Sequence, residues 1–265
     1  MNKNLHIAIV ASLLAGEEIL KIYQKDFNIE FKDDKSPLTE ADLASNKIII
    51  NKLKEVEIPI ISEENKQIDY QVRKNWNQCW IVDPIDGTKE FIKKNGEFTV
   101  NISLVEKGIP KLGIIYVPVT KELYYTNFNK TKAYKTIISN ADESIETLLF
   151  KDKDLIKPNV IKESKIKVVG SRSHMNEDTV QYVETLKENY EDVEIVSKGS
   201  SLKFCLVAEG KADVYPRFAP TMEWDTAAGQ AICEAAGLKV LDQGTQKPML
   251  YNRENLLNNY FLVTK

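Results

Sequence analysis

Carboxylic acids follow or precede apolar runs at three places in this sequence, and their spacing is the first sign of chemistry. Glu63 and Glu64 end one apolar run. Asp83 and Asp86 end another, and Asp225 stands before a run of small residues. Ionised acids are costly to bury unless something positive compensates them. Because oxygen-only ligands without a neighbouring His or Cys favour Mg²⁺ over zinc or copper, the three groups together predict a magnesium site.

A phosphate seat is predicted directly after the second group of acids. Asp83 and Asp86 stand three residues apart across a proline, so a turn at the strand end can aim both carboxylates at one point. If a short helix begins here, the backbone N–H groups of Asp86, Gly87 and Thr88 face outward at its N-terminus, where phosphates bind. Acids and N–H donors this close together are what metal-assisted phosphate hydrolysis requires.

Each acidic group taken alone has a simpler interpretation. An Asp-x-x-Asp-Gly-Thr segment is often only a turn with a capping aspartate, and Glu63 with Glu64 would be a solvated strand end. Asp225 alone would be a helix cap. The functional interpretation depends on the three groups occurring together, each at the end of an apolar element.

Composition narrows the class of protein. The 265 residues suffice for one large domain or two closely packed ones, and the net charge of −3 does not suit a nucleic-acid partner. Three widely spaced cysteines and two histidines predict neither a disulfide framework nor a zinc site, which favours the cytoplasm. The sequence predicts no membrane span, and the first helical pattern contains Glu17 and Glu18, unlike a secretory leader.

The elements that must position the acids alternate along the chain. Apolar periodicity predicts helices over residues 5–24, 39–53, 178–187, 201–209 and 225–236. Short apolar runs predict strands over residues 58–62, 80–82, 98–105, 112–117, 123–126, 166–169, 193–196 and 212–215. Thr39 and Asp42 have the spacing of a helix-capping arrangement. The alternation in the second half predicts helices that cover a sheet, an α/β organisation.

The weakest pattern lies between residues 127 and 165, and we place the boundary between two halves there. An N-terminal α+β half, residues 1–150, would carry most of the metal ligands. A C-terminal α/β half, residues 151–265, would carry Asp225 and the loops that select the substrate.

Two motifs together resemble the paired signature of the inositol monophosphatase superfamily of lithium-sensitive phosphatases. They are Asp-Pro-Ile-Asp-Gly-Thr at residues 83–88 and Trp-Asp-Thr-Ala-Ala-Gly at residues 224–229. A finer resemblance, to CysQ-type 3′(2′),5′-bisphosphate nucleotidases, extends over residues 36–237. It is carried by residues 39–42, 89–101, 171–174, 199–210 and 215–217. Residues 127–165 contribute nothing to it.

The resemblance implies a layered αβαβα sandwich with the active site between the two halves. It implies two or three Mg²⁺ ions per site. Glu63, Asp83 and the carbonyl of Ile85 would hold the first ion, and Asp83 would share a second with Asp86 and Asp225. Glu64 would not bind the metal directly but would lie next to the residues that do.

The resemblance also implies the catalytic pair and sensitivity to lithium. Thr88 would position the attacking water, and Asp42 would accept a hydrogen bond from Thr88 or act as base. The ligands Glu63, Asp86 and Asp225 would also contact the substrate, together with Gly87 and Thr88.

Substrate choice must come from the second half, because the metal ligands would look alike for any phosphomonoester. Ser171 and His174 follow one predicted strand, while Gly199 and Lys203 lie where another gives way to a helix. Such strand ends are where ligands bind in α/β sheets. The simpler interpretations are a surface histidine and an ordinary helix lysine.

The resemblance favours 3′-phosphate removal from adenosine 3′,5′-bisphosphate, giving AMP, and the same reaction on its sulfated precursor in sulfur assimilation. The alternatives are an inositol monophosphatase and a non-catalytic sensor of a bisphosphate nucleotide. The partner is a small molecule in each case. The oligomeric state is left open, as is peripheral attachment to the inner face of the cell membrane.

Overall fold

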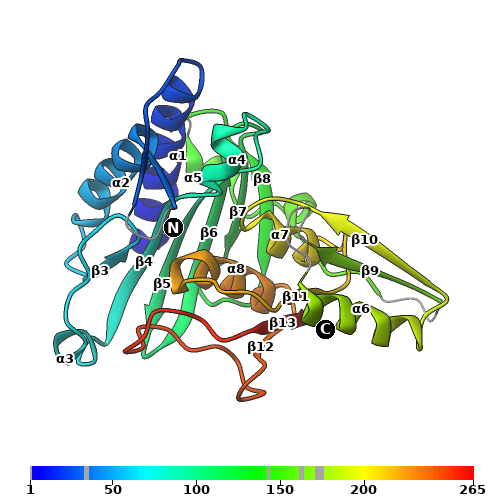
Figure 1. Ribbon diagram of the computed structural model, residues 1–265. Coiled ribbons are helices and arrows are strands. Elements are labelled where there is room, and N and C mark those ends of the chain that lie inside the picture. Colours follow the sequence, from blue (N-terminus) through cyan, green and yellow to red (C-terminus); the bar gives the residue numbers. More distant parts are fainter. Residues whose placement is uncertain (1, 33–35, 142–143, 161–163, 171–175) are drawn as a thin grey trace.

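A six-stranded sheet forms the centre of the molecule (Figure 1). The computed structural model describes residues 2–32, 36–141, 144–160, 164–170 and 176–265. In spatial order the strands are β3 (Ile60–Ser62), β4 (Gln78–Asp86), β5 (Thr99–Glu106), β6 (Ile109–Val117), β7 (Glu122–Thr126) and β8 (Ala133–Ile137). β3 and β4 are parallel, and the other neighbours are antiparallel. The central strands are apolar and buried because helices cover both faces of the sheet.

Two helices, α1 (Lys3–Tyr23) and α2 (Glu40–Leu53), cover one face. The side chain of Asn2 caps α1 by accepting the N–H groups of Asn4 and Leu5. α2 begins as predicted, because Thr39 N–H donates to Asp42 Oδ2 over 2.8 Å. The buried apolar residues of α1 recur at helical spacing and pack on the sheet.

The opposite face carries α8 (Glu223–Ala235), with α7 (Leu202–Ala208) packed beside it. Gly113 in β6 lets α8 approach closely, since a Cβ at this position would lie 2.4 Å from Ala228 O. Strands of the N-terminal half and helices of the C-terminal half contribute to one hydrophobic cluster. The division near residue 150 stays a prediction.

A second layer of strands lies beyond α7 and α8 and consists of two small sheets. β9 (Lys165–Gly170) and β10 (Asp192–Ser197) form a parallel pair. In the other sheet, β13 (Phe261–Thr264) pairs antiparallel with both β11 (Tyr215–Arg217) and β12 (Lys239–Asp242). An isolated parallel bridge between Val168 and Val214 connects the two sheets. With α6 (Glu177–Lys187) on the outer face of this layer, the predicted αβαβα layering is confirmed.

Several predicted boundaries move. The strand predicted at residues 80–82 does not end at Asp83 but continues to Asp86. The strand predicted at residues 212–215 begins at Tyr215, because Ala212 N–H still donates to Leu206 O at the end of α7. α8 starts at Glu223, two residues before the predicted Asp225. The short helix expected after Asp86 is α4 (Thr88–Ile92).

Some elements were not predicted at all. They are β1 (Ile29–Phe31), β2 (Pro37–Thr39), β8, β12, β13, α3 (Tyr70–Arg73), α5 (Ile145–Leu148) and a 3₁₀ turn at Asp152–Asp154. All of them have five residues or fewer, too short for a periodicity to show.

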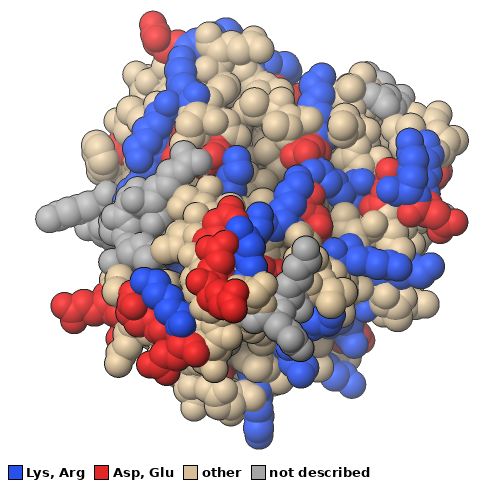
Figure 2. All heavy atoms as spheres, turned by 90° about the vertical axis from the view of Figure 1, so that its right-hand side faces the viewer, with Lys and Arg blue, Asp and Glu red and all other residues tan. Residues whose placement is uncertain are grey.

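The face formed by β9, β10 and α6 mixes both signs of charge (Figure 2). Lys165 pairs with Asp192 and Glu194, and Lys167 also contacts Glu194. Such interspersed charge differs from the basic stripe of a nucleic-acid-binding protein. Among the described residues, no helix is long and apolar enough to cross a membrane.

Candidate active site

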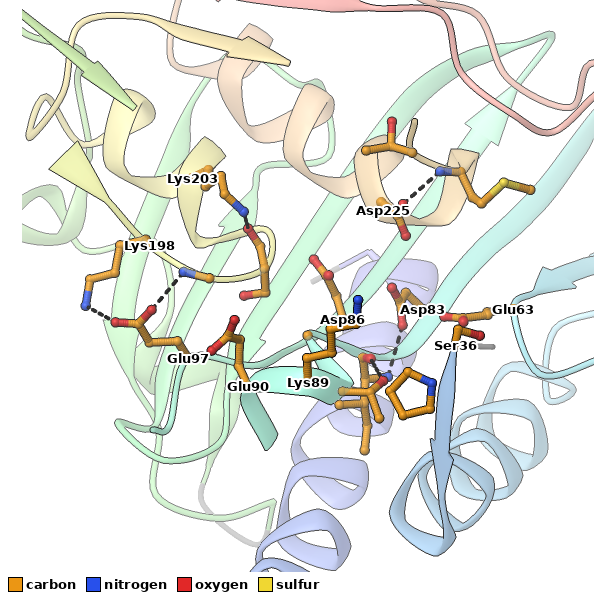
Figure 3. A pocket seen from close by; sticks show the side chains of 18 of the residues that line it. Ser36, Glu63, Asp83, Asp86, Lys89, Glu90, Glu97, Lys198, Lys203 and Asp225 are labelled. Atoms are coloured by element: carbon orange, nitrogen blue, oxygen red, sulfur yellow. Dashed lines mark hydrogen bonds and ion pairs between the residues drawn. The ribbon is translucent and has the colours of Figure 1, made fainter. Parts of the chain in front are cut away.

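A cavity of about 780 Å³ lies between the central sheet and the elements of the C-terminal half (Figure 3). It brings together most of the predicted site residues: Glu63, Asp83, Ile85, Asp86, Gly87, Thr88, Gly199, Lys203 and Asp225. Asp42 is buried behind Thr88. Ser171 and His174 lie outside the described residues, so their part in the site stays a prediction.

An irregularity in β4 brings Asp83 and Asp86 to the same side of the sheet. Asp83 is opposite Asn101 and Asp86 is opposite Thr99, so β4 carries one more residue than β5 between these pairs. In a regular strand two residues three apart would point to opposite faces. The extra residue is a β-bulge, which re-aims the second carboxylate.

Asp225 completes the cluster from the first turn of α8. Its Oδ2 accepts the N–H of Met222 over 2.7 Å, so the predicted capping role is met from the third position of the helix, with Met222 as the N-cap residue, and Asp225 is also a member of the site. Carboxylate oxygens of Asp83, Asp86 and Asp225 all lie within 4.8 Å of one another.

The electrostatics of this cluster call for a cation. Burial, and then the charges of Glu63, Asp86 and Asp225, raise the pKa of Asp83 well above its ordinary value. Burial and the neighbouring Asp86 raise the pKa of Asp225 to about 8. Carboxylates this close can all ionise only when positive charge is added. An oxygen-only donor set of this kind fits a hard divalent ion such as Mg²⁺.

Asp86 is held by two residues that the sequence analysis missed. Ser201 Oγ lies within hydrogen-bond reach of Asp86 Oδ2 and of Asp225 O, the latter at 3.1 Å. Asn101 Nδ2 donates to Ser201 Oγ over 2.7 Å and to Asp86 Oδ2 over 3.3 Å. A signal existed, because β5 carries polar residues at every second position, Thr99, Asn101 and Ser103, all fully buried. Buried polar side chains at strand spacing indicate a site on that face.

The predicted catalytic pair is in contact. Thr88 Oγ1 lies 3.2 Å from Asp42 Oδ1 and 3.4 Å from the carbonyl oxygen of Ile85. Thr39 donates its N–H and its hydroxyl to Asp42 Oδ2, which fixes the carboxyl group. Burial raises the pKa of Asp42, so this group is a stronger base than an exposed aspartate.

Lys32 is a further residue that the sequence analysis missed. Its Nζ lies 2.8 Å from Glu63 Oε1 and 2.6 Å from Glu64 Oε1, and all three side chains are largely shielded from solvent. The two carboxyls follow Lys32 by 31 and 32 residues, so no local pattern could have revealed the contact. Burial raises the pKa of Glu63, and the Lys32 ammonium group opposes that rise.

The other end of the cavity is formed by the loop between β10 and α7 (Figure 3). Lys203 Nζ donates to Ser200 O over 3.3 Å, and burial lowers the pKa of this lysine. Gly199 lines the cavity, but its N–H donates to Glu97 Oε2 over 2.8 Å rather than facing the opening. The Gly199 N–H is therefore already bonded within the protein, and a ligand at this end would have to contact other atoms of the loop.

Comparisons with known proteins cover nearly the whole chain. The sequence profile of the inositol monophosphatase family matches residues 2–263. The 3′(2′),5′-bisphosphate nucleotidase CysQ of Salmonella typhimurium is 44% identical over 256 residues, covering 94% of this chain and 95% of the relative. Its counterpart from Buchnera aphidicola is also 44% identical, covering 94% and 89%. The crystal structure of CysQ from Bacteroides thetaiotaomicron superimposes with a TM-score of 0.87 at 49% identity, covering 98% of this chain and 96% of that one.

Proposed function

The chain belongs to the inositol monophosphatase family, and we propose that it is a Mg²⁺-dependent 3′(2′),5′-bisphosphate nucleotidase. The reaction is hydrolysis of the 3′-phosphate of adenosine 3′,5′-bisphosphate, giving AMP and phosphate, with the sulfated precursor as a second substrate in sulfur assimilation. The single observation that carries the phosphatase chemistry is the cluster of buried Asp83 with half-buried Asp86 and Asp225 in the cavity. The near-full-length similarity to curated CysQ proteins supports the choice of nucleotide.

The acids would hold two or three Mg²⁺ ions. Glu63, Asp83 and the carbonyl of Ile85 would bind one ion, and Asp86 and Asp225 would share another with Asp83. When bound, Mg²⁺ lowers the pKa of a coordinated water and offsets negative charge on the phosphate and the leaving oxygen. Since Asp83 and Asp225 are occupied as ligands, the proposal includes no phosphorylated enzyme.

Thr88 and Asp42 are suited to place and deprotonate the attacking water. Thr88 donates its hydroxyl proton to Asp42 or to the Ile85 carbonyl, which leaves the lone pairs of Oγ1 free to accept a hydrogen bond from a water in the cavity. A proton of the attacking water can then pass to the Thr88 hydroxyl as the hydroxyl gives its own proton to Asp42, whose buried carboxyl has a raised pKa.

The other end of the cavity would hold the nucleoside. Its volume of about 780 Å³ is in the range of pockets for small organic ligands. Lys203 would supply positive charge toward the substrate, and Gly199 would allow close approach of the loop. Ser171 and His174 would complete this end, with His174 stacking on the base or donating to it.

The test compares phosphate release from three substrates at the same Mg²⁺ concentration. Adenosine 3′,5′-bisphosphate is expected to be hydrolysed with a higher kcat/KM than inositol 1-phosphate or fructose 1,6-bisphosphate. A preference for inositol 1-phosphate would overturn the nucleotidase assignment and leave only a phosphatase. No turnover of any of the three would favour a non-catalytic sensor.

Lithium sensitivity is part of the proposal. Li⁺ would occupy one cation position in the oxygen-only cluster and delay product release. LiCl is expected to inhibit at concentrations at which NaCl has no effect, and equal inhibition by the two salts would contradict it.

We also place the protein in the cytoplasm. Cys79, Cys205 and Cys233 are all buried and free, a state that a reducing compartment maintains. The substrates, a small nucleotide and water, require neither a nucleic-acid surface nor a membrane anchor.

A further inference from the structure

Glu97 joins the two sides of the cavity. It stands between α4 and β5, and its side chain is 12% exposed. Oε2 accepts the N–H of Gly199 over 2.8 Å, and Oε1 lies 3.1 Å from Lys198 Nζ (Figure 3). The N–H of Glu97 donates to Asn95 Oδ1 over 2.9 Å, which ties its backbone to the turn after α4.

The loop that Glu97 holds leads directly into α7, and the two together carry residues of both ends of the site. Gly199 fits closely against the N-terminal half, because a Cβ here would lie 2.8 Å from Glu97 O and 2.8 Å from Glu90 Cγ. Two residues further on, Ser201 contacts Asp86, and four residues further on, Lys203 lines the cavity. A shift of Gly199 away from Glu97 is therefore expected to move Lys203, whereas Ser201 is also held by Asn101 and by the Asp225 carbonyl.

We infer that Glu97 is a positioning residue that sets the substrate-selecting loop against the acid cluster. The bond to the Gly199 amide carries this role, and the ion pair with Lys198 does not. The hydrogen bond from the Gly199 N–H to the Glu97 carboxylate is charge-assisted and shielded from solvent, so its loss is costly. Lys198 is 41% exposed, and ion pairs at such positions contribute little. The effect on nucleotide use rests on the proposed function, whereas the effect on the loop does not.

The experiment compares Glu97→Ala, Glu97→Gln and Lys198→Met with the wild-type protein. Hydrogen exchange in the peptide that contains Gly199 reports the loop directly, without any substrate. Steady-state kinetics on adenosine 3′,5′-bisphosphate and on p-nitrophenyl phosphate measure how the displaced loop affects the use of each substrate. For Glu97→Ala, we expect faster exchange and a KM for the nucleotide raised about tenfold or more. The KM for p-nitrophenyl phosphate should change by less than about threefold, since this small ester needs few contacts with the loop.

The two remaining variants distinguish the contribution of the hydrogen bond to the Gly199 N–H from that of the ion pair with Lys198. Glu97→Gln keeps an oxygen that can accept the Gly199 N–H, so it should restore most of the protection and most of the KM. Lys198→Met should resemble the wild type in both measurements. If Glu97→Ala does not fold, Gly199→Ala displaces the same loop from the other side and should raise the nucleotide KM similarly.

Three results would overturn the inference. They are unchanged exchange at Gly199 in Glu97→Ala, equal loss on both substrates, and a Glu97→Gln variant as impaired as Glu97→Ala. If the wild type fails to hydrolyse the nucleotide, the proposed function falls, but the exchange data still decide the role of Glu97.

Discussion

The acid end of the cavity and its loop end are held in place by different means. At the acid end, Asp83, Asp86 and Asp225 stand on a buried strand and on a buried helix, and their charges repel one another. At the loop end, Gly199 and Lys203 are held by hydrogen bonds to Glu97 and to the backbone. The acid end is thus fixed mainly by the core, with Ser201 and Asn101 bonded to Asp86, and kept under electrostatic repulsion, whereas the loop end is fixed by a few replaceable contacts. Substitutions should therefore separate turnover from substrate choice.

The largest effect is expected from removing a charge at the acid end. Asp83→Asn and Asp225→Asn should each lower kcat by a factor of about 1,000 or more, because the variant would lose one of the proposed metal ligands. Asparagine has nearly the same shape, so circular dichroism should show an unchanged fold. Asp178→Asn, an exposed acid in α6, is the matched control. Wild-type kcat in either cluster variant would contradict the metal assignment.

A smaller and selective effect is expected at the loop end. Lys203→Ala should lower kcat/KM for adenosine 3′,5′-bisphosphate by about 10- to 100-fold, the range of one charge-assisted contact. Hydrolysis of p-nitrophenyl phosphate should fall by less than about threefold. Lys211→Ala removes a lysine that is 59% exposed and serves as control. Equal losses on both substrates would show that the two ends are not separable.

The repulsion at the acid end can be measured through pH. Asp225 has a folded pKa of about 8, above its ordinary 3.8, so the stability that its protonated form contributes is present below pH 3.8 and lost as the pH rises through 8. In the metal-free protein, Asp225→Asn should therefore gain in melting temperature relative to the wild type between pH 5 and 9. Saturating Mg²⁺ at pH 9 should stabilise the wild type more than the variant. Parallel curves of melting temperature against pH would rule out this account.

The smallest effect is expected from Lys32, which neutralises part of the acid end without a metal. Lys32→Met should lower the melting temperature of the metal-free protein by a few degrees, because Glu63 and Glu64 lose their partner. It should tighten Mg²⁺ binding by about threefold in calorimetry, since no ammonium group then competes for Glu63. Lys25→Met, in an exposed position, is the control. Weaker Mg²⁺ binding would mean that Lys32 orients Glu63 instead of competing for it.

The acid end could be predicted from the sequence because its information is local. Each acid follows or begins an apolar element, and that pattern predicts that Asp83, Asp86 and Asp225 share one site. The capping pattern of Thr39 and Asp42 likewise gave the start of α2. The layered architecture followed from the alternation of elements and from the family resemblance.

The loop end could not be predicted in the same way because its contacts are not local. Gly199 meets Glu97 across 102 residues, and Asn101 meets Ser201 across 100. Neither contact corresponds to a periodic pattern of residues in the sequence. The bulge in β4 was missed for a different reason, since an extra residue shows only in the register with β5. Such long-range contacts depend on how the strands and helices are connected in space, and the secondary-structure propensities of single residues carry no information about that arrangement.

If the acid cluster binds metal as proposed, the absent side chain of Gly113 would influence which ions the site accepts. α8 rests on the backbone of β6 at this glycine, and the position of the helix sets how far Asp225 stands from the acids of β4. A methyl group there would meet Ala228 O at 2.4 Å and would lift the helix. Mg²⁺ takes oxygen ligands at about 2.0–2.1 Å and Ca²⁺ at about 2.3–2.6 Å. Gly113 lies outside the acid cluster, but Gly113→Ala should widen the spacing of the cluster and shift its binding preference toward the larger ion.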